Sequence, residues 1–460
     1  MSTQQTGPRD DTLWRRVVRE LADDLAVDAH ARDRAGKSPG DEVERLQEAG
    51  LPAFLTAADP DPTLGGGGHG ADLRTACSAV RELSAADSSV GELLAHHYAL
   101  SWTSRFLAGP SGRAGETFPR LDARTAAEGW LLAGSAEPPS ARTAPGLTLT
   151  RADRGGWLLD GRRAFDSAVT VADRLVVAAR PAGTGDLLVV LVDPAHPGVF
   201  ADPAPDRVGQ RLAGAGTVVF DHVPVPRTRV LGTLPADEHA IAPFTTLAPL
   251  VLRLLLVHVA LGIAEGALAE ARDVNRSALA PERSPAPRDA APAHGPGTRG
   301  RSARGPADHG PTDHRLTDHG LSDHGLPEQG DDPYLLLSYG ELATAAHTAA
   351  AVAERATDAL AHGLRSGWTL GFEERADLAV LVAAAETVTG RTAVQLTTRI
   401  LELVEGAPPA APGAGGGGPG FDRFWRNARA LTARTRPAHR LRDIGDHYLN
   451  NTHTRLARSA

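Results

Sequence analysis

The hydrophobic pattern of this 460-residue chain changes its period twice. Between residues 14 and 25 the apolar side chains recur every three to four positions, which places them along one face of a helix. From about Trp130 the period becomes two, in short runs that glycine, proline and aspartate turns separate. Long helical patterns return after Pro243. This order of helices, strands and helices predicts a mainly α-helical fold with a central β-barrel.

We predict three domains along this pattern. An N-terminal helical domain occupies residues 1–121, a middle β domain occupies 122–232, and a C-terminal four-helix bundle occupies 233–460. The bundle contains a tract at about 280–330 that is rich in Pro, Gly, Arg and Asp. Such a composition cannot bury enough apolar surface to fold, so we predict that the tract is a disordered insertion.

The insertion carries Asp-His pairs that recur every five residues between 308 and 324. A period of five matches neither a helix nor a strand. Four histidines at this spacing could bind a transition metal weakly. Expansion of a short repeat explains the pattern without any function, so we predict no metal site.

Composition argues against several classes of protein. The 48 basic and 56 acidic residues give a net charge of -8, and the basic residues are scattered, so we expect no nucleic-acid surface. The single cysteine, Cys77, cannot form an internal disulfide, and no secretion leader is evident, which favours a cytoplasmic protein. The most apolar stretch, residues 247–263, contains Pro249, Arg253 and His258, which favours a buried bundle helix over a membrane span.

Four short segments give the chain a specific resemblance. Residues 421–429 read FDRFWRNAR and residues 444–450 read IGDHYLN, while GQR and GT lie within 209–217, and DPY and GEL lie within 332–342. These segments are similar to motifs of the flavin-dependent monooxygenase branch of the acyl-CoA dehydrogenase superfamily, which includes dibenzothiophene monooxygenases and sulfur acquisition oxidoreductases. Apart from the insertion and a glycine-rich loop, the resemblance runs from about Trp14 to Leu449.

The resemblance implies both a fold and an activity. The fold is that of the acyl-CoA dehydrogenases, with an N-terminal helical domain, a middle β domain and a C-terminal helical bundle. Enzymes of this branch take reduced FMN from a separate flavin reductase and use it with O2 to oxygenate a small organic substrate. An organosulfur compound in sulfur metabolism and a natural product are both compatible with the sequence. The flavin carries the difficult chemistry and the protein supplies an oriented pocket. Members are usually homotetramers.

The resemblance also implies three flavin contacts. Arg276, near the end of a bundle helix, corresponds to an arginine that reaches the flavin phosphate. Ser167 corresponds to a serine beside the isoalloxazine ring, and Ser135 lies in the loop that contacts the ring. Arg276 and Ser167 also have structural explanations, because the helix dipole stabilises an arginine at a helix C-terminus and serines commonly cap turns.

Several family positions carry different residues here. The branch has two histidines after its WRNAR motif, where this sequence has Leu431 and Arg434, and neither can shuttle a proton near neutral pH. We still expect Arg434 to contact the cofactor. A family histidine and tyrosine one helical turn apart correspond to Glu92 and His96, which leaves His96 as the candidate acid or base. His97 is a candidate for the substrate pocket, because neighbours on a helix point about a quarter-turn apart.

Two further replacements keep other functions open. Ala215 stands where the branch has a serine, and Pro408 stands where it has an arginine. One alternative is an FAD-dependent acyl-CoA dehydrogenase, although the sequence offers no motif for the carboxylate base that such an enzyme requires. The other is a flavin-binding protein that has lost turnover and only assembles with partners.

Overall fold

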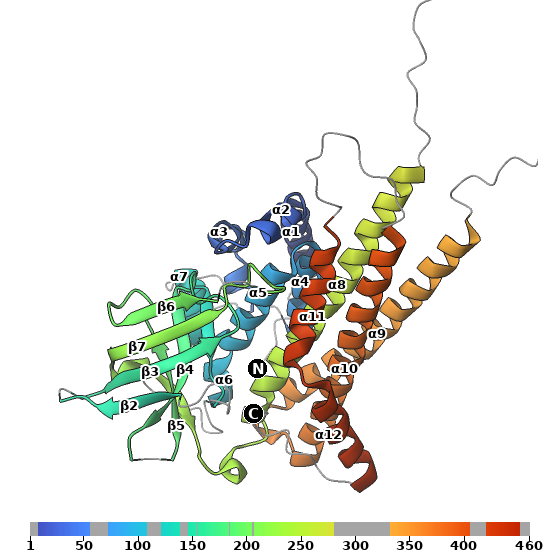
Figure 1. Cartoon of the computed structure of the whole chain (residues 1–460). Helices are drawn as coiled ribbons and strands as arrows, with labels where there is room; N and C mark the ends of the chain where they lie inside the picture. Colours follow the sequence, from blue (N-terminus) through green and yellow to red (C-terminus); the bar gives the residue numbers. More distant parts are fainter. Residues whose placement is uncertain are drawn as a thin grey trace, which may run out of the picture.

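The computed structural model describes most of the chain, namely residues 8–55, 72–107, 121–138, 146–279, 332–404 and 420–450, apart from 154, 184 and 205–206. The predicted insertion, its Asp-His repeat and Pro408 lie outside these residues. Figure 1 shows the β-sheet on one side and the long C-terminal helices on the other, with N-terminal helices between and above them.

Helices make up the N-terminal part of the described chain. Asp72 begins α4 by accepting a hydrogen bond from the Thr75 amide, and Asp87 begins α5 by accepting from the amides of Ser89 and Val90. Helix α5 is buried on nearly all sides because it packs against both α8 and β1. The elements are α1 (Pro8–Ala26), α2 (Ala29–Ala35), α3 (Gly40–Glu48), η1 (Leu51–Ala53), α4 (Leu73–Ala86), α5 (Ser88–Ser101), α6 (Thr103–Leu107) and α7 (Leu121–Glu128).

In the described part of the chain, eight strands form the central β domain. They pair in the order β6-β7-β3-β2-β4-β5-β8, and β1 lies beside β4. The β1–β4 and β2–β4 pairs are parallel and the other pairs are antiparallel. The strands are β1 (Leu132–Ser135), β2 (Leu147–Arg151), β3 (Trp157–Phe165), β4 (Arg174–Pro181), β5 (Leu187–Val192), β6 (Val199–Pro203), β7 (Gly216–Val225) and β8 (Val230–Leu234).

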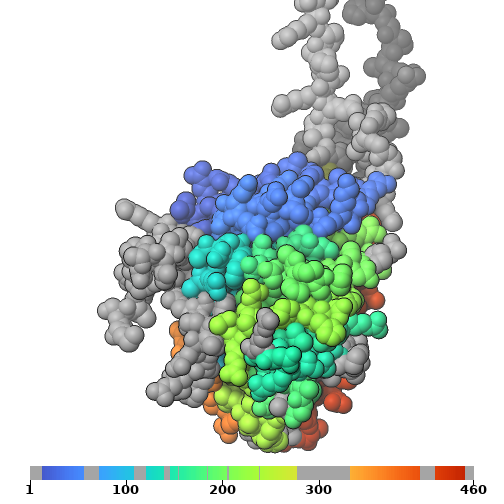
Figure 2. All heavy atoms as spheres, turned by 90° about the vertical axis from the view of Figure 1, so that its left-hand side faces the viewer, coloured from blue at the N-terminus to red at the C-terminus, as the bar shows by residue number. Residues whose placement is uncertain are grey.

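Both faces of β4 are buried, which explains why its apolar residues form a continuous run without polar residues between them. Leu175 and Val177 point into the core of the β domain, whereas Val176 and Ala178 point toward the helical side and pack near Leu121. Figure 2 shows the face of the molecule that carries the strands, with the N-terminal helices along one edge of it.

The C-terminal part is helical, as predicted. The helix that begins at Thr245 is, among the described residues, long and apolar enough to cross a membrane, yet 72% of its most apolar window is buried inside the protein, so it is a core helix. The elements are η5 (Thr245–Leu247), α8 (Ala248–Leu279), α9 (Pro333–Ser366), α10 (Phe372–Val404), α11 (Asp422–Arg434) and α12 (Pro437–Asn450). The predicted domain boundaries remain a proposal.

Helix α11 links the three parts of the fold. Asn427 accepts a hydrogen bond on Oδ1 from the Gln210 amide (2.7 Å) and donates one from Nδ2 to Ser88 Oγ (2.9 Å). The backbone before β7 approaches α11 so closely that a Cβ on Gly209 would lie 2.3 Å from the Arg426 carbonyl oxygen. The GQR and WRNAR motifs therefore have a structural role, which is to lock the β domain and α5 onto α11.

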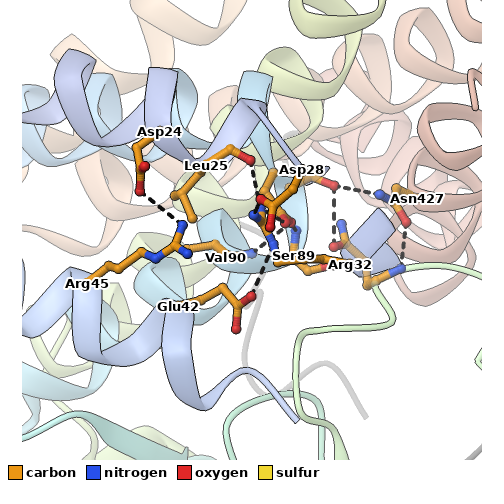
Figure 3. Close-up of polar contacts among 12 residues, drawn as sticks. Asp24, Leu25, Asp28, Arg32, Glu42, Arg45, Ser89, Val90 and Asn427 are labelled. Carbon is orange, nitrogen blue, oxygen red and sulfur yellow. Dashed lines mark hydrogen bonds and ion pairs between the residues drawn. The ribbon is translucent and has the colours of Figure 1, made fainter. Parts of the chain in front are cut away.

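A largely buried arginine, whose side chain is 11% exposed, reinforces this junction from the N-terminal side. Arg32 of α2 donates to the Leu25 carbonyl oxygen (2.7 Å) and forms ion pairs with Asp87 (2.9 Å) and Glu42 (3.0 Å). Figure 3 shows this network together with Asn427. Because Asp87 also caps α5, Arg32 fixes the start of the helix that carries the candidate site.

Candidate functional site

Two polar side chains lie one helical turn apart inside α5. Glu92 has no exposed surface and His96 is 8% exposed. Burying a carboxylate is costly unless other groups compensate its charge. Glu92 therefore needs partners from outside its own helix.

Those partners come from the other two parts of the fold. Nη1 of Arg434, the last residue of α11, donates a hydrogen bond to Glu92 Oε1 and lies 3.6 Å from Asp166 Oδ1. Asp166 directly follows β3. His96 Nε2 lies 3.9 Å from the same Glu92 oxygen. We call Glu92, His96, Asp166 and Arg434 the Glu92 cluster.

The Glu92 cluster contains buried polar atoms without hydrogen-bond partners. Among the described residues these are Glu92 Oε2, His96 Nε2 and Arg434 Nη2. Buried polar atoms are nearly always paired in native proteins, so these three atoms are available for hydrogen bonds to a bound molecule. Together they offer an acceptor, a donor and a histidine nitrogen that can do either, which fits the mixed donors and acceptors of a flavin ring.

The charges of the cluster set the protonation of His96. Burial lowers the pKa of His96, the Arg434 charge lowers it further, and the charges of Glu92 and Asp166 oppose both effects. The imidazole is therefore neutral near pH 7 and can accept a proton. Burial also lowers the pKa of Arg434, but the charges of Glu92 and Asp166 outweigh burial and raise it overall, so Arg434 remains a cation.

Ser167 lies next to Asp166 in a constrained turn. Ser167 is buried, and Ala168 after it has a φ of 60°, a left-handed conformation that is unfavourable for alanine. Two backbone hydrogen bonds hold the turn, from the Ala168 amide to the Ala213 oxygen (2.7 Å) and from the Val169 amide to the Gly214 oxygen (2.8 Å). The strained turn fixes Asp166 and Ser167 relative to α11.

Ser135 ends β1 and is held by hydrogen bonds. Its Oγ accepts from Arg163 Nη2 (3.0 Å) and from the Glu137 amide (3.2 Å). These contacts tie Ser135 to β3 and to the segment that follows β1.

His97 points elsewhere. Its Nε2 lies 2.9 Å from the Pro52 carbonyl oxygen, and its Nδ1 accepts a hydrogen bond from the Leu132 amide (3.0 Å). Burial lowers the pKa of His97 to about 4, so the ring is neutral with its proton on Nε2. Both ring nitrogens are used by the backbone, which makes His97 a core residue that ties α5 to β1.

Two other predicted positions lie outside the cluster. Arg276 is exposed near the end of α8. Helix α11 begins beside that end, where Arg423 pairs with Glu270, and Arg434 is at the other end of α11. A single chain therefore does not bring Arg276 to His96. Leu431 is buried in the helical core.

Sequence reasoning missed Asp166 and the pairing of Glu92 with Arg434. Each position by itself is only a departure from a family motif, and 342 residues separate the pair. The sequence carries no local signal that the two side chains meet.

Comparison with known proteins finds relatives along nearly the whole chain. No protein-family model matches the chain. The chain is 28% identical to a dibenzothiophene monooxygenase from Mycolicibacterium goodii over 94% of this chain and 93% of that protein. It is 26% identical to a probable FMNH2-dependent monooxygenase, SfnC, from Pseudomonas putida over 95% of this chain and 94% of that protein.

Solved structures agree with these relatives. The structure of TdsC from Paenibacillus sp. A11-2 in complex with FMN and indole superposes with a TM-score of 0.74 at 27% identity, covering 95% of this chain and 97% of that chain. Butyryl-CoA dehydrogenase from Megasphaera elsdenii shares the fold, with a TM-score of 0.66, 17% identity and coverage of 98% of this chain and all of that chain (100%). The fold is therefore that of the acyl-CoA dehydrogenases, as predicted. Over nearly its whole length the chain is similar to FMNH2-dependent monooxygenases with this fold, among them dibenzothiophene monooxygenase and SfnC.

Proposed function

We propose that the chain is an active FMNH2-dependent monooxygenase that oxygenates a small organic substrate at the Glu92 cluster. The observation that carries the proposal is the meeting of α5, the turn after β3 and the end of α11 around three buried polar atoms without partners. The names of the relatives and the FMN in the TdsC complex support FMN as the cofactor.

The cofactor would supply the electrons and the chain would supply orientation and proton transfer. Reduced FMN from a separate flavin reductase would provide two electrons, with which O2 gives one oxygen atom to the substrate and the other to water. Ser167, Ser135 and Arg434 would hold the flavin ring, and Arg276 is the proposed phosphate contact. We expect Arg276 to reach a flavin only in an assembly of chains, because it is remote from His96 within one chain.

His96 would move the proton. Of the four residues of the Glu92 cluster, only a histidine has an ordinary pKa near neutrality. Its burial and its neutral state suit a general base that becomes an acid after accepting a proton. Arg434 stays charged and would stabilise negative charge without transferring a proton.

Turnover with isotopic oxygen tests the proposal. The full-length protein would be mixed with FMN, an NADH-dependent flavin reductase and 18O2, and candidate thioethers and amines would be analysed by mass spectrometry. We expect one 18O atom in the product, loss of turnover in His96→Gln, and retained turnover in His97→Gln, its matched control in the same helix.

Two other results would each reject this function. FMN binding without oxygenation of any substrate would leave a flavin-binding protein without turnover. Retention of FAD, with bleaching of its absorbance by an acyl-CoA, would identify a dehydrogenase. A sulfur-containing substrate, a homotetramer and a cytoplasmic location remain predictions.

A further inference from the structure

The β domain carries a groove that is separate from the Glu92 cluster. The groove has a volume of about 770 Å³ and is formed by the β2–β3 turn and by the segments that follow β5 and β7. None of the four residues of the Glu92 cluster lines it. We call it the Trp157 groove, and its walls include Asp153, Trp157, Asp193, Pro224, Pro226 and Arg229.

Trp157 forms the aromatic wall of the groove. It begins β3, where it pairs with Arg151 of β2 on one side and with Val225 of β7 on the other, and it is only partly buried. The Arg151 guanidinium stacks on the indole, with Cζ 4.4 Å from the ring centroid. Arg151 does not line the groove, so the part of the indole that faces the groove is available to a ligand.

The prolines of the groove limit the kind of ligand that fits. Pro224 and Pro226 are exposed on either side of Val225, and β6 pairs with β7 only from Gly216 to Phe220. This part of β7 is therefore an open edge, but prolines have no N–H with which to pair an added strand. Grooves lined by aromatic side chains instead bind extended proline-containing peptides through ring contacts.

The charges of the groove suggest a second feature of the ligand. Asp153 is exposed in the β2–β3 turn, while Asp193 and Arg229 are partly buried. Asp193 Oδ1 accepts a hydrogen bond from the Ala195 amide (3.0 Å) and lies 3.8 Å from Arg174 Nη1, which holds this carboxylate in place. Carboxylates bind arginine side chains through paired charge-assisted hydrogen bonds. A peptide with several arginines and fewer acids would complement two carboxylates and one guanidinium.

The chain itself contains a segment with this chemistry. Residues 281–306 hold six prolines, five arginines and two acidic residues. We call residues 281–306 the Pro-Arg segment. It is the first half of the predicted insertion and lies outside the described residues.

The insertion is long enough to bring this segment to the groove. About 50 residues separate the end of α8 at Leu279 from the start of α9 at Pro333. A loop of that length reaches about 80 Å from its ends, at about 3.3 Å per residue out and back. A compact chain of 460 residues is roughly 60 Å across, so the reach exceeds the size of the protein.

We propose that the Pro-Arg segment binds in the Trp157 groove of its own chain, with prolines against Trp157 and arginines toward Asp153 and Asp193. A tethered segment has an effective concentration on the order of 1 mM, so even a weak site is occupied. This binding goes beyond the monooxygenase function and does not depend on a flavin.

Competition with a free peptide tests the occupant. A variant that lacks residues 281–306 keeps α8 and α9 whole, because the deletion lies between them, and equal urea midpoints would establish that it folds like the full chain. A fluorescein-labelled peptide of residues 281–306 would be titrated into both proteins and followed by anisotropy. We expect the deletion variant to bind the peptide about tenfold more tightly, because the tethered segment competes in the full chain. Equal affinities, or binding by neither protein, would overturn the proposal.

Substitutions in the deletion variant test the groove. Asp153→Lys changes an exposed turn residue, and Trp157→Leu keeps an apolar side chain against the β domain, so both are expected to fold. Each should weaken peptide binding about tenfold. Asp202→Lys is the control, because Asp202 is exposed on β6 and makes the same charge change outside the groove. If both groove variants bind the peptide as the control does, the peptide binds elsewhere and the assignment of the groove is wrong.

Altered peptides separate specific docking from general attraction to an acidic protein. One peptide would have its five arginines replaced by glutamine, and another would have its six prolines replaced by alanine. We expect each to bind the deletion variant about tenfold more weakly than the original peptide. Full affinity of the proline-free peptide would mean that charge alone carries the binding, which would reject docking against Trp157.

Discussion

Arg434 at the end of α11 donates a hydrogen bond to Glu92 inside α5, and the carboxylate that it contacts has no exposed surface. When the sequence is compared with the family motifs, Glu92 and Arg434 are two separate substitutions. In the structure they form one ion pair, in which the Arg434 guanidinium compensates the charge of the buried Glu92 carboxylate. The positions of two family proton-transferring groups thus hold a fixed ion pair. His96 beside it is the group of the Glu92 cluster whose ordinary pKa lies near neutrality, and burial lowers that pKa.

The pair predicts an asymmetric effect on stability. Arg434→Gln leaves the fully buried Glu92 without its cation, which we expect to cost about 3–5 kcal/mol of unfolding free energy. Glu92→Gln should cost less, about 1–3 kcal/mol, because Arg434 keeps Asp166 within 3.6 Å and 23% of its side chain is exposed. The double variant should cost less than the two single costs together. Urea unfolding of the flavin-free protein at pH 7 measures all three.

An exposed ion pair serves as the control. Arg399 and Glu402 lie one turn apart on α10, and about half of each side chain is exposed (52% and 55%). Replacing either by Gln should leave the urea midpoint unchanged, because exposed pairs contribute little. Equal, additive costs for Glu92 and Arg434 would show that their pairing does not stabilise the fold.

The sequence was sufficient to predict the order of helices and strands, because the period of apolar residues follows directly from strand and helix geometry. It could not decide between His96 and His97. Helix α5 is buried on nearly all sides, so no polar stripe distinguishes the face toward the site from the face toward β1. Only the backbone contacts of His97 with Pro52 and Leu132 settle its direction.

Distance along the chain limited the prediction in other ways. The likeness of Arg276 to a family residue carries no information about its distance from Ser167 in this chain. Asp166 was overlooked beside Ser167, because an exposed aspartate in a turn resembles any turn residue until the structure places it 3.6 Å from Arg434. Conversely, Asn427 and Gln210 lie in the motifs that reveal the family, yet their hydrogen bonds show that they hold domains together.

That role of Asn427 gives a second prediction. Asn427→Ala would leave the buried Gln210 amide without its acceptor and leave the Ser88 hydroxyl with only a long hydrogen bond (3.5 Å) to Gln210 Oε1, which should lower the unfolding free energy by about 2–4 kcal/mol. Asn450→Ala is the control, because Asn450 is exposed and its hydrogen bond goes to Asp446 within the same helix, α12. Urea unfolding measures both variants. A loss no greater for Asn427→Ala than for Asn450→Ala would mean that α11 is held chiefly by its apolar contacts.

The buried histidines predict that the protein loses stability in acid. Burial lowers the pKa of His97 to about 4 and that of His258 to about 3, whereas an unfolded histidine titrates near 6.5. Below pH 6.5 the unfolded chain binds protons that the folded chain does not. The unfolding free energy therefore keeps its highest value above pH 6.5 and decreases as the pH is lowered from 6.5 to 4. For His97 alone the loss amounts to about 3 kcal/mol.

His97→Gln isolates this contribution. The amide of glutamine can accept from the Leu132 amide and donate to the Pro52 oxygen, as His97 does, but it takes up no proton. We therefore expect similar stability at pH 7 and a shallower fall between pH 6.5 and 4, measured by urea unfolding at steps of half a pH unit. His362→Gln, an exposed histidine on α9, should follow the unmodified protein. A His97→Gln curve parallel to the unmodified one would show that the imidazole is protonated in the folded protein and that its core placement is wrong.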